Sequence, residues 1–210
     1  ENIINKIEKN TVKLSTIAEM PRGIAISVSD NIILKKYKSN YIKLLTGRNI
    51  GKYYIKKAPE HYVPSNYYHE KYKEKKILSQ NLAYKIVSAL DTKGSLVNDT
   101  VNTIFINNKN YLIEYVLAIL NSKLMIFYLQ NAITNKAKLN IHLDTPYIGQ
   151  IPIKKVSLKK QKEIKKLVED LLKTNSFDLR EMIEKKINEI YNIDENFDIK
   201  KYSIYGKMNI

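Results

Sequence analysis

The chain has 210 residues, of which 36 are Lys or Arg and 21 are Asp or Glu, so its formal net charge is +15. Hydrophobic residues make up 44%, enough for a packed core, and the lack of cysteine excludes disulfides, thiolate metal sites and cysteine nucleophiles. The charge favours a polyanionic partner, although abundant Lys also reflects AT-rich genomes, and a basic surface also suits RNA or an anionic membrane. No apolar run reaches about 18 residues, so no membrane span is predicted.

Short extended segments joined by loops are predicted for the first 35 residues. Residues 3–14 indicate a linker or a first strand, and Pro21 ends the regular structure before it. Arg22 follows, next to a glycine, and is expected on a loop where its guanidinium can contact a partner. Two β-leaning runs, 24–28 and 32–34, are separated by a turn signature.

Residues 46–55 contain two glycines, four positions apart, that bracket Arg48 and Asn49. The Arg fork suits phosphate or guanine, and Asn can pair bidentately with adenine. Lys52 and Tyr53 follow in the same loop, so all four are candidate DNA contacts. The competing interpretation is that Arg48 pairs with a carboxylate and fixes the loop. The spacing is wrong for a phosphate-binding P-loop.

Lys and Tyr side chains alternate over residues 67–76. This pattern suits a surface that follows a nucleic-acid backbone, with Lys on phosphates. A solvated charged face explains the same pattern equally well. The candidate contacts in this run are Lys71, Lys73, Lys75 and Lys76.

Residues 76–80 and 84–90 predict two further strands. The Asp-Thr-Lys-Gly turn at 91–94 predicts a hairpin that joins the second of them to a strand beginning at Val97. Lys93 lies in this turn and is also a candidate DNA contact. With the earlier runs, six or seven short strands are expected to form a twisted, partly closed sheet.

The stretch from residue 101 to residue 129 is expected to anchor the fold. Residues 101–106 predict a buried strand, an Asn-rich turn follows, and residues 113–127 predict one amphipathic helix with a continuous apolar stripe. Asn121 and Ser122 within this helix are interpreted as structural residues that close a helix–sheet contact. Residues 132–142 predict a loop.

The pattern changes from strand to helix periodicity near Pro152, after a short strand predicted at 148–153. Ser157 is expected to cap a first helix, and Asp178 with Glu181 resembles a capping box for a second. The two helices are joined near residues 174–177.

The predicted fold class is α+β, with two parts. Residues 1–153 are expected to form a recognition domain, a twisted and partly closed mixed β-sheet with a buried helix. Residues 154–210 are expected to form an α-helical hairpin, over about 157–192, and a tail with a final short element at 197–205.

Two weak patterns allow catalytic interpretations. Residues 144–147, Asp-Thr-Pro-Tyr, nearly match the Asp/Asn-Pro-Pro-Tyr loop of amino-methyltransferases, but a Thr replaces the first proline and no glycine-rich cofactor loop follows a strand. Glu60 with Glu74 and Lys76 imitates the acidic and Glu-x-Lys groups of metal-dependent nucleases. Three histidines lack zinc-ligand spacing: His61, His69 and His142. The chain is therefore interpreted as a binding protein.

Several short motifs occur in a fixed order over roughly residues 20–195. They are Pro21-Arg22-Gly23-Ile24; Leu45…Gly47-Arg48-Asn49-Ile50…Tyr53-Tyr54; Lys76-Ile77-Leu78-Ser79; Asp91…Gly94; Tyr115…Leu117-Ala118-Ile119-Leu120-Asn121-Ser122-Lys123-Leu124; Tyr147-Ile148…Ile151-Pro152-Ile153; and Gln161-Lys162…Ile164. Together they resemble the target-recognition domain of restriction–modification proteins. The closest form is the TaqI-like C-terminal specificity domain of type IIG and N6-adenine DNA methyltransferases, which is akin to type I specificity subunits.

This resemblance implies cytoplasmic, sequence-specific recognition of double-stranded DNA by a fragment that is not itself catalytic. It implies an adenine methyltransferase module upstream in the same chain or as a separate subunit, with or without an endonuclease. S-adenosylmethionine, and Mg²⁺ where a nuclease is present, are expected there, and no cofactor is expected here. The start at Glu1 without Met fits a fragment. The alternatives are a nuclease or methyltransferase in its own right, and a protein-interaction module that uses the helical hairpin.

The resemblance transfers no base-contacting residues, because those loops vary with the target sequence. The candidate DNA contacts are therefore chosen from side-chain chemistry and position. They are Arg22, Arg48, Asn49, Lys52, Tyr53, Lys71, Lys73, Lys75, Lys76 and Lys93.

Overall fold

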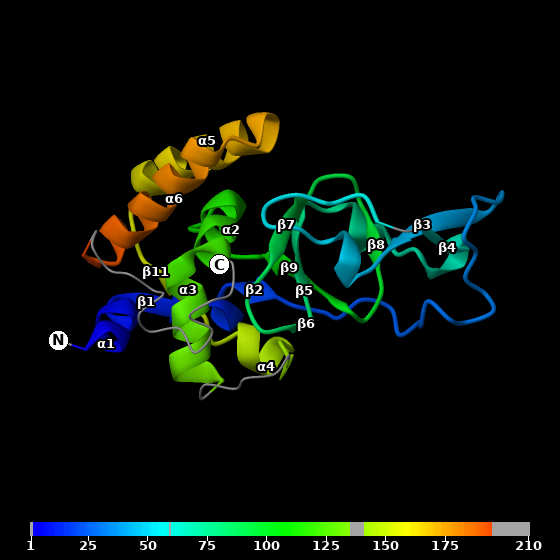
Figure 1. Cartoon of the computed structure of the whole chain (residues 1–210), viewed down its shortest axis with the longest axis horizontal. Coiled ribbons are helices and arrows are strands. Elements are labelled where there is room, and N and C mark those ends of the chain that lie inside the picture. The colour runs from blue at the N-terminus through cyan, green and yellow to red at the C-terminus, as the bar shows by residue number, and fades with distance from the viewer. Residues whose placement is uncertain (1, 59, 135–140, 195–210) are drawn as a thin grey trace.

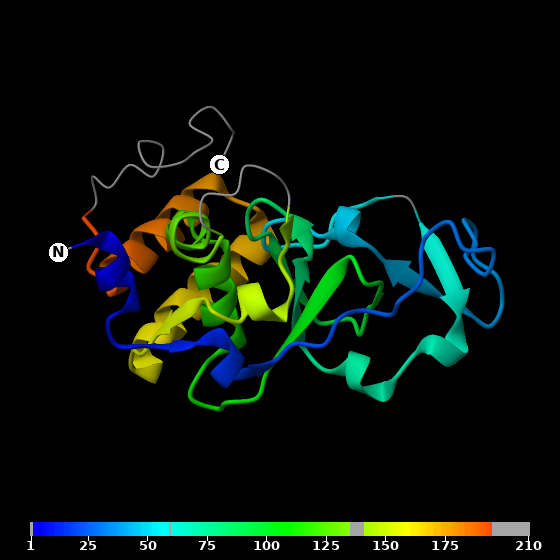
Figure 2. The same ribbon diagram turned by 90° about the horizontal axis from the view of Figure 1, so that it is seen from below.

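The computed structural model describes residues 2–58, 60–134 and 141–194 and shows an elongated molecule with two ends of different character (Figures 1 and 2). We call residues 18–106 the β lobe, because its described elements are strands and short helical turns. We call the remaining described residues the helical lobe. The element predicted at 197–205 lies outside the described residues.

A four-stranded antiparallel sheet forms the centre of the β lobe, in the order β2-β9-β5-β7. Its strands are β2 (Ala18–Glu19), β5 (Lys76–Gln80), β7 (Ser88–Asp91) and β9 (Val101–Ile106). The pairing of β2 with β9 places Ala18 opposite Ile106, so the chain enters and leaves the β lobe at adjacent strands. The predictions of strands at 76–80 and 101–106 are confirmed.

A three-stranded sheet, in the order β4-β3-β8, forms the outer part of the β lobe (Figure 1). Its strands are β3 (Tyr41–Leu45), β4 (His61–Pro64) and β8 (Leu96–Val97), and β8 runs parallel to β3. A third, two-stranded sheet pairs β6 (Leu82–Ala83) with β10 (Ile141–His142). Short helical turns connect the strands: η2 (Gly47–Asn49), η3 (Ser65–Tyr67) and η4 (Glu70–Lys73).

Two strand predictions in this lobe are wrong. The turn at 91–94 forms, but it does not make a hairpin from β7 to the next strand. One edge of β7 pairs with β5, and the other is occupied by Tyr53, whose N–H donates to the Ser88 carbonyl at 2.7 Å. The chain beyond the turn therefore continues to β3. The runs at 24–28 and 32–34 make only isolated bridges, to Asn98 and Tyr62.

The predicted central helix is broken into two parts. α2 (Ile113–Asn121) and α3 (Lys123–Tyr128), which continues into the wider turn η5 (Leu129–Ile133), meet at a bend of 59°. Ser122 has extended backbone at the bend, and its hydroxyl accepts a hydrogen bond from the Met125 N–H at 3.2 Å. A new helix therefore starts here, although the apolar stripe continues.

Asn121 closes the contact between helix and sheet that the sequence predicted. Its amide accepts from the Ser88 N–H at 3.0 Å and donates to the Ser88 carbonyl at 2.9 Å. No single helix of the described residues is long and apolar enough to cross a membrane; the bent pair of α2 with α3 and η5 passes that test only when its parts are combined, and it is almost entirely buried.

The C-terminal helical hairpin is confirmed as α5 (Leu158–Thr174) and α6 (Phe177–Ile190), which pack on α2 and share the larger core. Ser157 caps α5 as predicted, but Ser176, not Asp178, caps α6. Residue 148 ends the short helix α4 (Thr145–Ile148), so the predicted strand is limited to β11 (Pro152–Lys154).

The N-terminal segment completes the helical lobe. It forms α1 (Ile3–Glu8), β1 (Thr11–Lys13) and the turn η1 (Leu14–Thr16), and β1 pairs antiparallel with β11. The α+β class, with a buried helix and a C-terminal hairpin, is confirmed, and the sheets of the described residues are open. The division of the chain at residue 153 stays a prediction.

Replacing Ser122 tests the break between α2 and α3. Ser122→Ala should lower the free energy of unfolding by about 1 kcal/mol, because the first turn of α3 loses its cap, whereas Ser122→Gly should cost only a few tenths. Urea denaturation of both variants measures the difference. A larger loss for glycine would show that the side chain acts through packing rather than as a cap.

Candidate nucleic-acid interface

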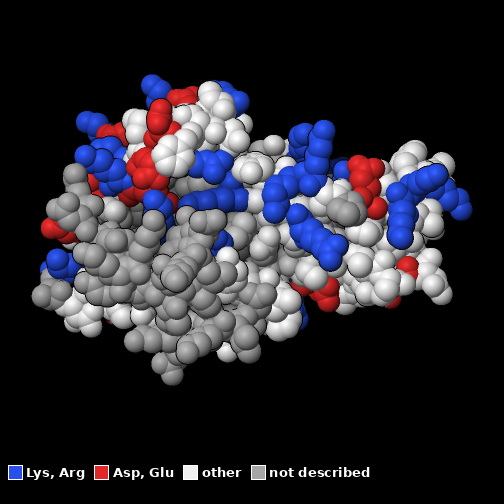
Figure 3. Space-filling view, in the orientation of Figure 1, with Lys and Arg blue, Asp and Glu red and all other residues white. Residues whose placement is uncertain are grey.

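Residues 31–59 contain eight Lys and Arg and no Asp or Glu. They include β3, η2 and the segment that leads toward β4, and so form much of the outer part of the β lobe. Basic side chains gather over the middle and the outer end of this lobe (Figure 3). A surface with this excess of positive charge attracts a polyanion.

Most of these cations have no acidic partner among the described residues. Only Lys43 and Lys52 of the eight form an ion pair there, with Glu60 and Glu184. The others are exposed and have no carboxylate of the described ranges within 4.0 Å: Lys35, Lys36, Lys38, Arg48, Lys56 and Lys57. They are therefore free to contact an anionic ligand.

A cleft of about 770 Å³ lies beside this segment. Its walls come from residues 25–35, from η2, and from the turn between β8 and β9, with His61 and Gln80 also contributing. The residues that line it include the cations Arg48 and Lys35, the acid Asp99, and Thr100. A cleft with this lining offers both donors and acceptors to a ligand.

The backbone around Arg48 is fixed at several points. The Gly47 N–H donates to the Thr100 hydroxyl at 2.8 Å, and the Gln80 amide donates to the carbonyls of Gly47 and Ile50, both at 2.9 Å. A side chain at position 47 would approach the Thr100 carbonyl within 3.2 Å, so the small residue permits this close contact. Arg48 is thus an exposed guanidinium on a rigid loop, and no residue of the described ranges pairs with it.

Two candidates from this loop are buried and unavailable to a ligand. Asn49 is 2% exposed, and its side-chain oxygen accepts from the Thr46 N–H at 2.9 Å in a capping arrangement for η2. Tyr53 is also 2% exposed, and burial raises the pKa of its phenol far above the ordinary value. This conformation therefore offers neither side chain to DNA, because the Asn49 amide caps its own loop and the Tyr53 phenol is buried.

The Lys run at 71–76 is also corrected. Each Lys of this run has a carboxylate partner: Lys71 with Glu19, Lys73 with Glu70, Lys75 with Glu114 and Lys76 with Asp91. Lys76 is completely buried and cannot reach a phosphate. The other three keep enough exposure to exchange a carboxylate for a phosphate, and Glu70 raises the pKa of Lys73 through their hydrogen bond.

The remaining candidates lie in different places. Arg22 is exposed but lies 3.1 Å from the Asp144 carboxylate, and the Lys52 ammonium lies 3.2 Å from Glu184. Lys93 is exposed in its turn and has no acidic partner among the described residues. The structure therefore does not bring all ten candidates into one surface, and Arg48 is the one that lines the cleft.

Sequence reasoning missed the free Lys residues on either side of Arg48. They are two Lys-Lys pairs, at 35–36 and 56–57, and Lys38. The signal that would have identified them is the absence of acidic residues between Asp30 and Glu60, whereas the selected run at 71–76 is flanked by Glu70 and contains Glu74.

The catalytic patterns are not assembled as their chemistry requires. Asp144 precedes α4 and pairs with Arg22, and Lys76 pairs with Asp91 instead of supporting Glu60 or Glu74. In the described part of the chain, no group of three or more His, Asp or Glu residues is placed to hold a metal ion.

Residues 42–153, just over half of the chain, match the family described as TaqI-like C-terminal specificity domain. Among curated proteins, none matches this chain.

Three solved structures share its fold at low sequence identity. The type IIG restriction endonuclease BpuSI has a TM-score of 0.61 at 10% identity, over 98% of this chain and 33% of that chain. The type IIL restriction–modification enzyme MmeI, in complex with DNA, has 0.55 at 7%, over 90% and 35%. A chain of a type I restriction–modification system has 0.50 at 10%, over 86% and 45%. The present chain thus spans between a third and a half of these proteins.

Proposed function

The chain belongs to the TaqI-like C-terminal specificity domains, and from this premise we propose that it reads a base sequence in double-stranded DNA for a restriction–modification protein. In this proposal it selects the site, and a methyltransferase module carries out the chemistry. The module lies upstream in the same chain or in a separate subunit. The complex works in the cytoplasm, where its DNA substrate is.

The observation that carries this proposal is the state of Arg48. Its guanidinium is exposed, unpaired within the described residues and held on a fixed loop at the edge of a cleft. A guanidinium can donate two parallel hydrogen bonds to O6 and N7 of guanine in the major groove. The free Lys residues on either side supply the phosphate contacts that orient a duplex but do not read it.

We assign the cofactors to the other module. S-adenosylmethionine, and Mg²⁺ where an endonuclease is present, belong with the methyltransferase and nuclease parts, because the sequence has no glycines at the G-x-G spacing of a cofactor-binding loop. The proposal treats this chain as non-catalytic. A turnover assay on the pure chain tests that point: Mg²⁺-dependent cutting that Glu74→Ala abolishes would support the alternative of a nuclease.

Binding of the chain to duplex DNA should be weak and steeply dependent on salt. Each phosphate contact contributes about −0.9 to the slope of log affinity against log salt. Lys57→Ala should therefore reduce the magnitude of that slope by about one and weaken binding to all sequences alike. Fluorescence anisotropy over a salt series measures both quantities.

Lys159→Ala is the matched control for this measurement. Lys159 lies in the first turn of α5 in the helical lobe, is exposed and, like Lys57, has no acidic partner among the described residues. If the β lobe carries the contacts, this control leaves the slope unchanged. Equal effects of the two substitutions would show that binding follows total charge rather than a defined face.

A further inference from the structure

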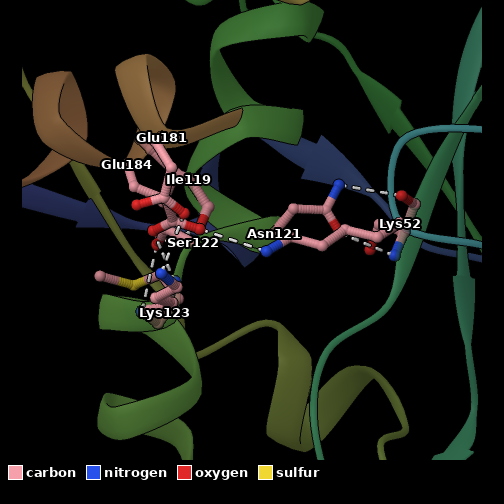
Figure 4. A network of polar contacts seen from close by, with 9 residues as sticks. Lys52, Ile119, Asn121, Ser122, Lys123, Glu181 and Glu184 are labelled. Atoms are coloured by element: carbon pink, nitrogen blue, oxygen red, sulfur yellow. Dashed lines mark hydrogen bonds and ion pairs between the residues drawn. The ribbon is translucent and has the colours of Figure 1, made fainter. Parts of the chain in front are cut away.

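One contact of the loop at residues 46–55, which carries Arg48, reaches the helical lobe. Lys52 follows η2 by three residues, and its ammonium donates to Glu184 of α6 at 3.2 Å (Figure 4). The second carboxylate oxygen of Glu184 accepts from the Lys123 N–H, at the start of α3, at 2.9 Å. Only 9% of the Glu184 side chain is exposed. One nearly buried carboxylate thus joins α6, α3 and the loop that carries Arg48.

The same end of the loop is held under backbone strain. Tyr53 has a φ of 77°, which is unfavourable for a residue with a side chain. Its N–H donates to the Ser88 carbonyl and its own carbonyl accepts from the Leu90 N–H. The Ser88 backbone is held in turn by Asn121, at the end of α2. The path of the loop therefore depends on contacts outside it.

We propose that Glu184 is a positioning residue for DNA recognition, which sets the path of the Lys52–Tyr53 end of the loop and so the placement of Arg48. Lys52 then links the loop to the helical hairpin through Glu184 and does not contact a phosphate. This inference rests on the proposed function, and it extends the recognition apparatus to α6, beyond the β lobe.

The loop that carries Arg48 is restrained on both sides of that residue. Gln80 and Thr100 fix the loop at Gly47, before Arg48, and Gln80 also holds the Ile50 carbonyl after it. Further along, the loop is held by the Lys52 contact and by the backbone of Tyr53. Without the Lys52 contact, residues 52–53 lose their link to α6 and depend on the backbone hydrogen bonds of Tyr53, in a conformation that its own sterics oppose. A side chain that must meet a base edge within hydrogen-bonding distance tolerates little movement of its backbone.

The test is a double-mutant cycle in the complete restriction–modification protein, with bound duplexes selected from a randomised library. Lys52→Met and Glu184→Gln should each reduce discrimination at the base pair that Arg48 reads by about threefold to tenfold. The double variant should lose no more than either single variant, because both remove one contact. Lys52→Arg keeps the ion pair and should keep the preference.

Glu181→Gln is the control, because Glu181 also lies on α6 and pairs with Lys123 but not with Lys52. It should leave discrimination unchanged. Three results would overturn the inference: unchanged preference in both single variants, a lower melting temperature with unchanged preference, or a reduced salt slope for Lys52→Met alone. A wild-type protein without any sequence preference would instead refute the proposed function.

Discussion

Arg48→Lys is expected to relax the preference of the complete restriction–modification protein at one base pair of its target, by about 1–3 kcal/mol. Lys keeps the charge but replaces a planar fork by a point charge, so the paired hydrogen bonds to guanine are lost while attraction to the backbone remains. Selection from a randomised duplex library, before and after the substitution, measures the change position by position.

The structure makes this result separable from a loss of folding. Arg48 is exposed and has no partner in the described part of the chain, so the substitution should leave the melting temperature unchanged. The competing interpretation from the sequence, a carboxylate partner that fixes the loop, has no support among the described residues. A uniform loss of affinity over all sequences would assign Arg48 to phosphate contact.

Lys76→Met is expected to lower the free energy of unfolding by about 3–5 kcal/mol, because it leaves the Asp91 carboxylate as an unpaired buried charge. Both side chains are fully buried, and the Lys76 ammonium lies 2.7 Å from Asp91. It also donates to the Tyr72 carbonyl at 2.5 Å, so the substitution removes a second, partly buried hydrogen bond. Urea denaturation at neutral pH measures the loss.

A second substitution distinguishes the charge from the packing. In Lys76→Met with Asp91→Asn, no charge remains buried, so the combined loss should be smaller than the sum of the two single losses. The salt slope of DNA binding, measured where the variants remain folded, should equal that of the wild type. A reduced slope in a folded Lys76→Met protein would restore the original expectation of a phosphate contact.

Local patterns identified the parts of the fold that depend on neighbouring residues. β5, β9 and the hairpin helices follow from periodicity, and Ser157 from its capping chemistry. Strand pairings between residues far apart in the sequence could not be predicted from local patterns. The edge of β7, for example, is occupied by Tyr53, a residue 35 positions before Ser88. The break at Ser122 carried a local signal, an Asn-Ser pair, which the continuous apolar stripe concealed.

The same limit applies to the candidate site. Lys76 looks like its neighbours in a basic run, and only the three-dimensional position of Asp91 makes it a core residue. Asn49 has a side chain that suits adenine, but it contacts Thr46, which is close to it in sequence. This local capping interaction could therefore be predicted from the sequence. Arg48 differs from Lys76 and Asn49 in its solvent exposure, which its residue type alone does not predict.

Because β2 pairs with β9, the β lobe begins and ends at neighbouring strands, which allows it to be exchanged as one segment. A segment whose two ends meet on adjacent strands can be replaced by another of different length without moving either junction. Under the proposed function, exchange of the β lobe would change the DNA target and leave the helical lobe in place. Glu184 belongs to the helical lobe and is not part of the exchanged segment. A replacement β lobe therefore keeps the contact with α6 if it has a cation at the position of Lys52.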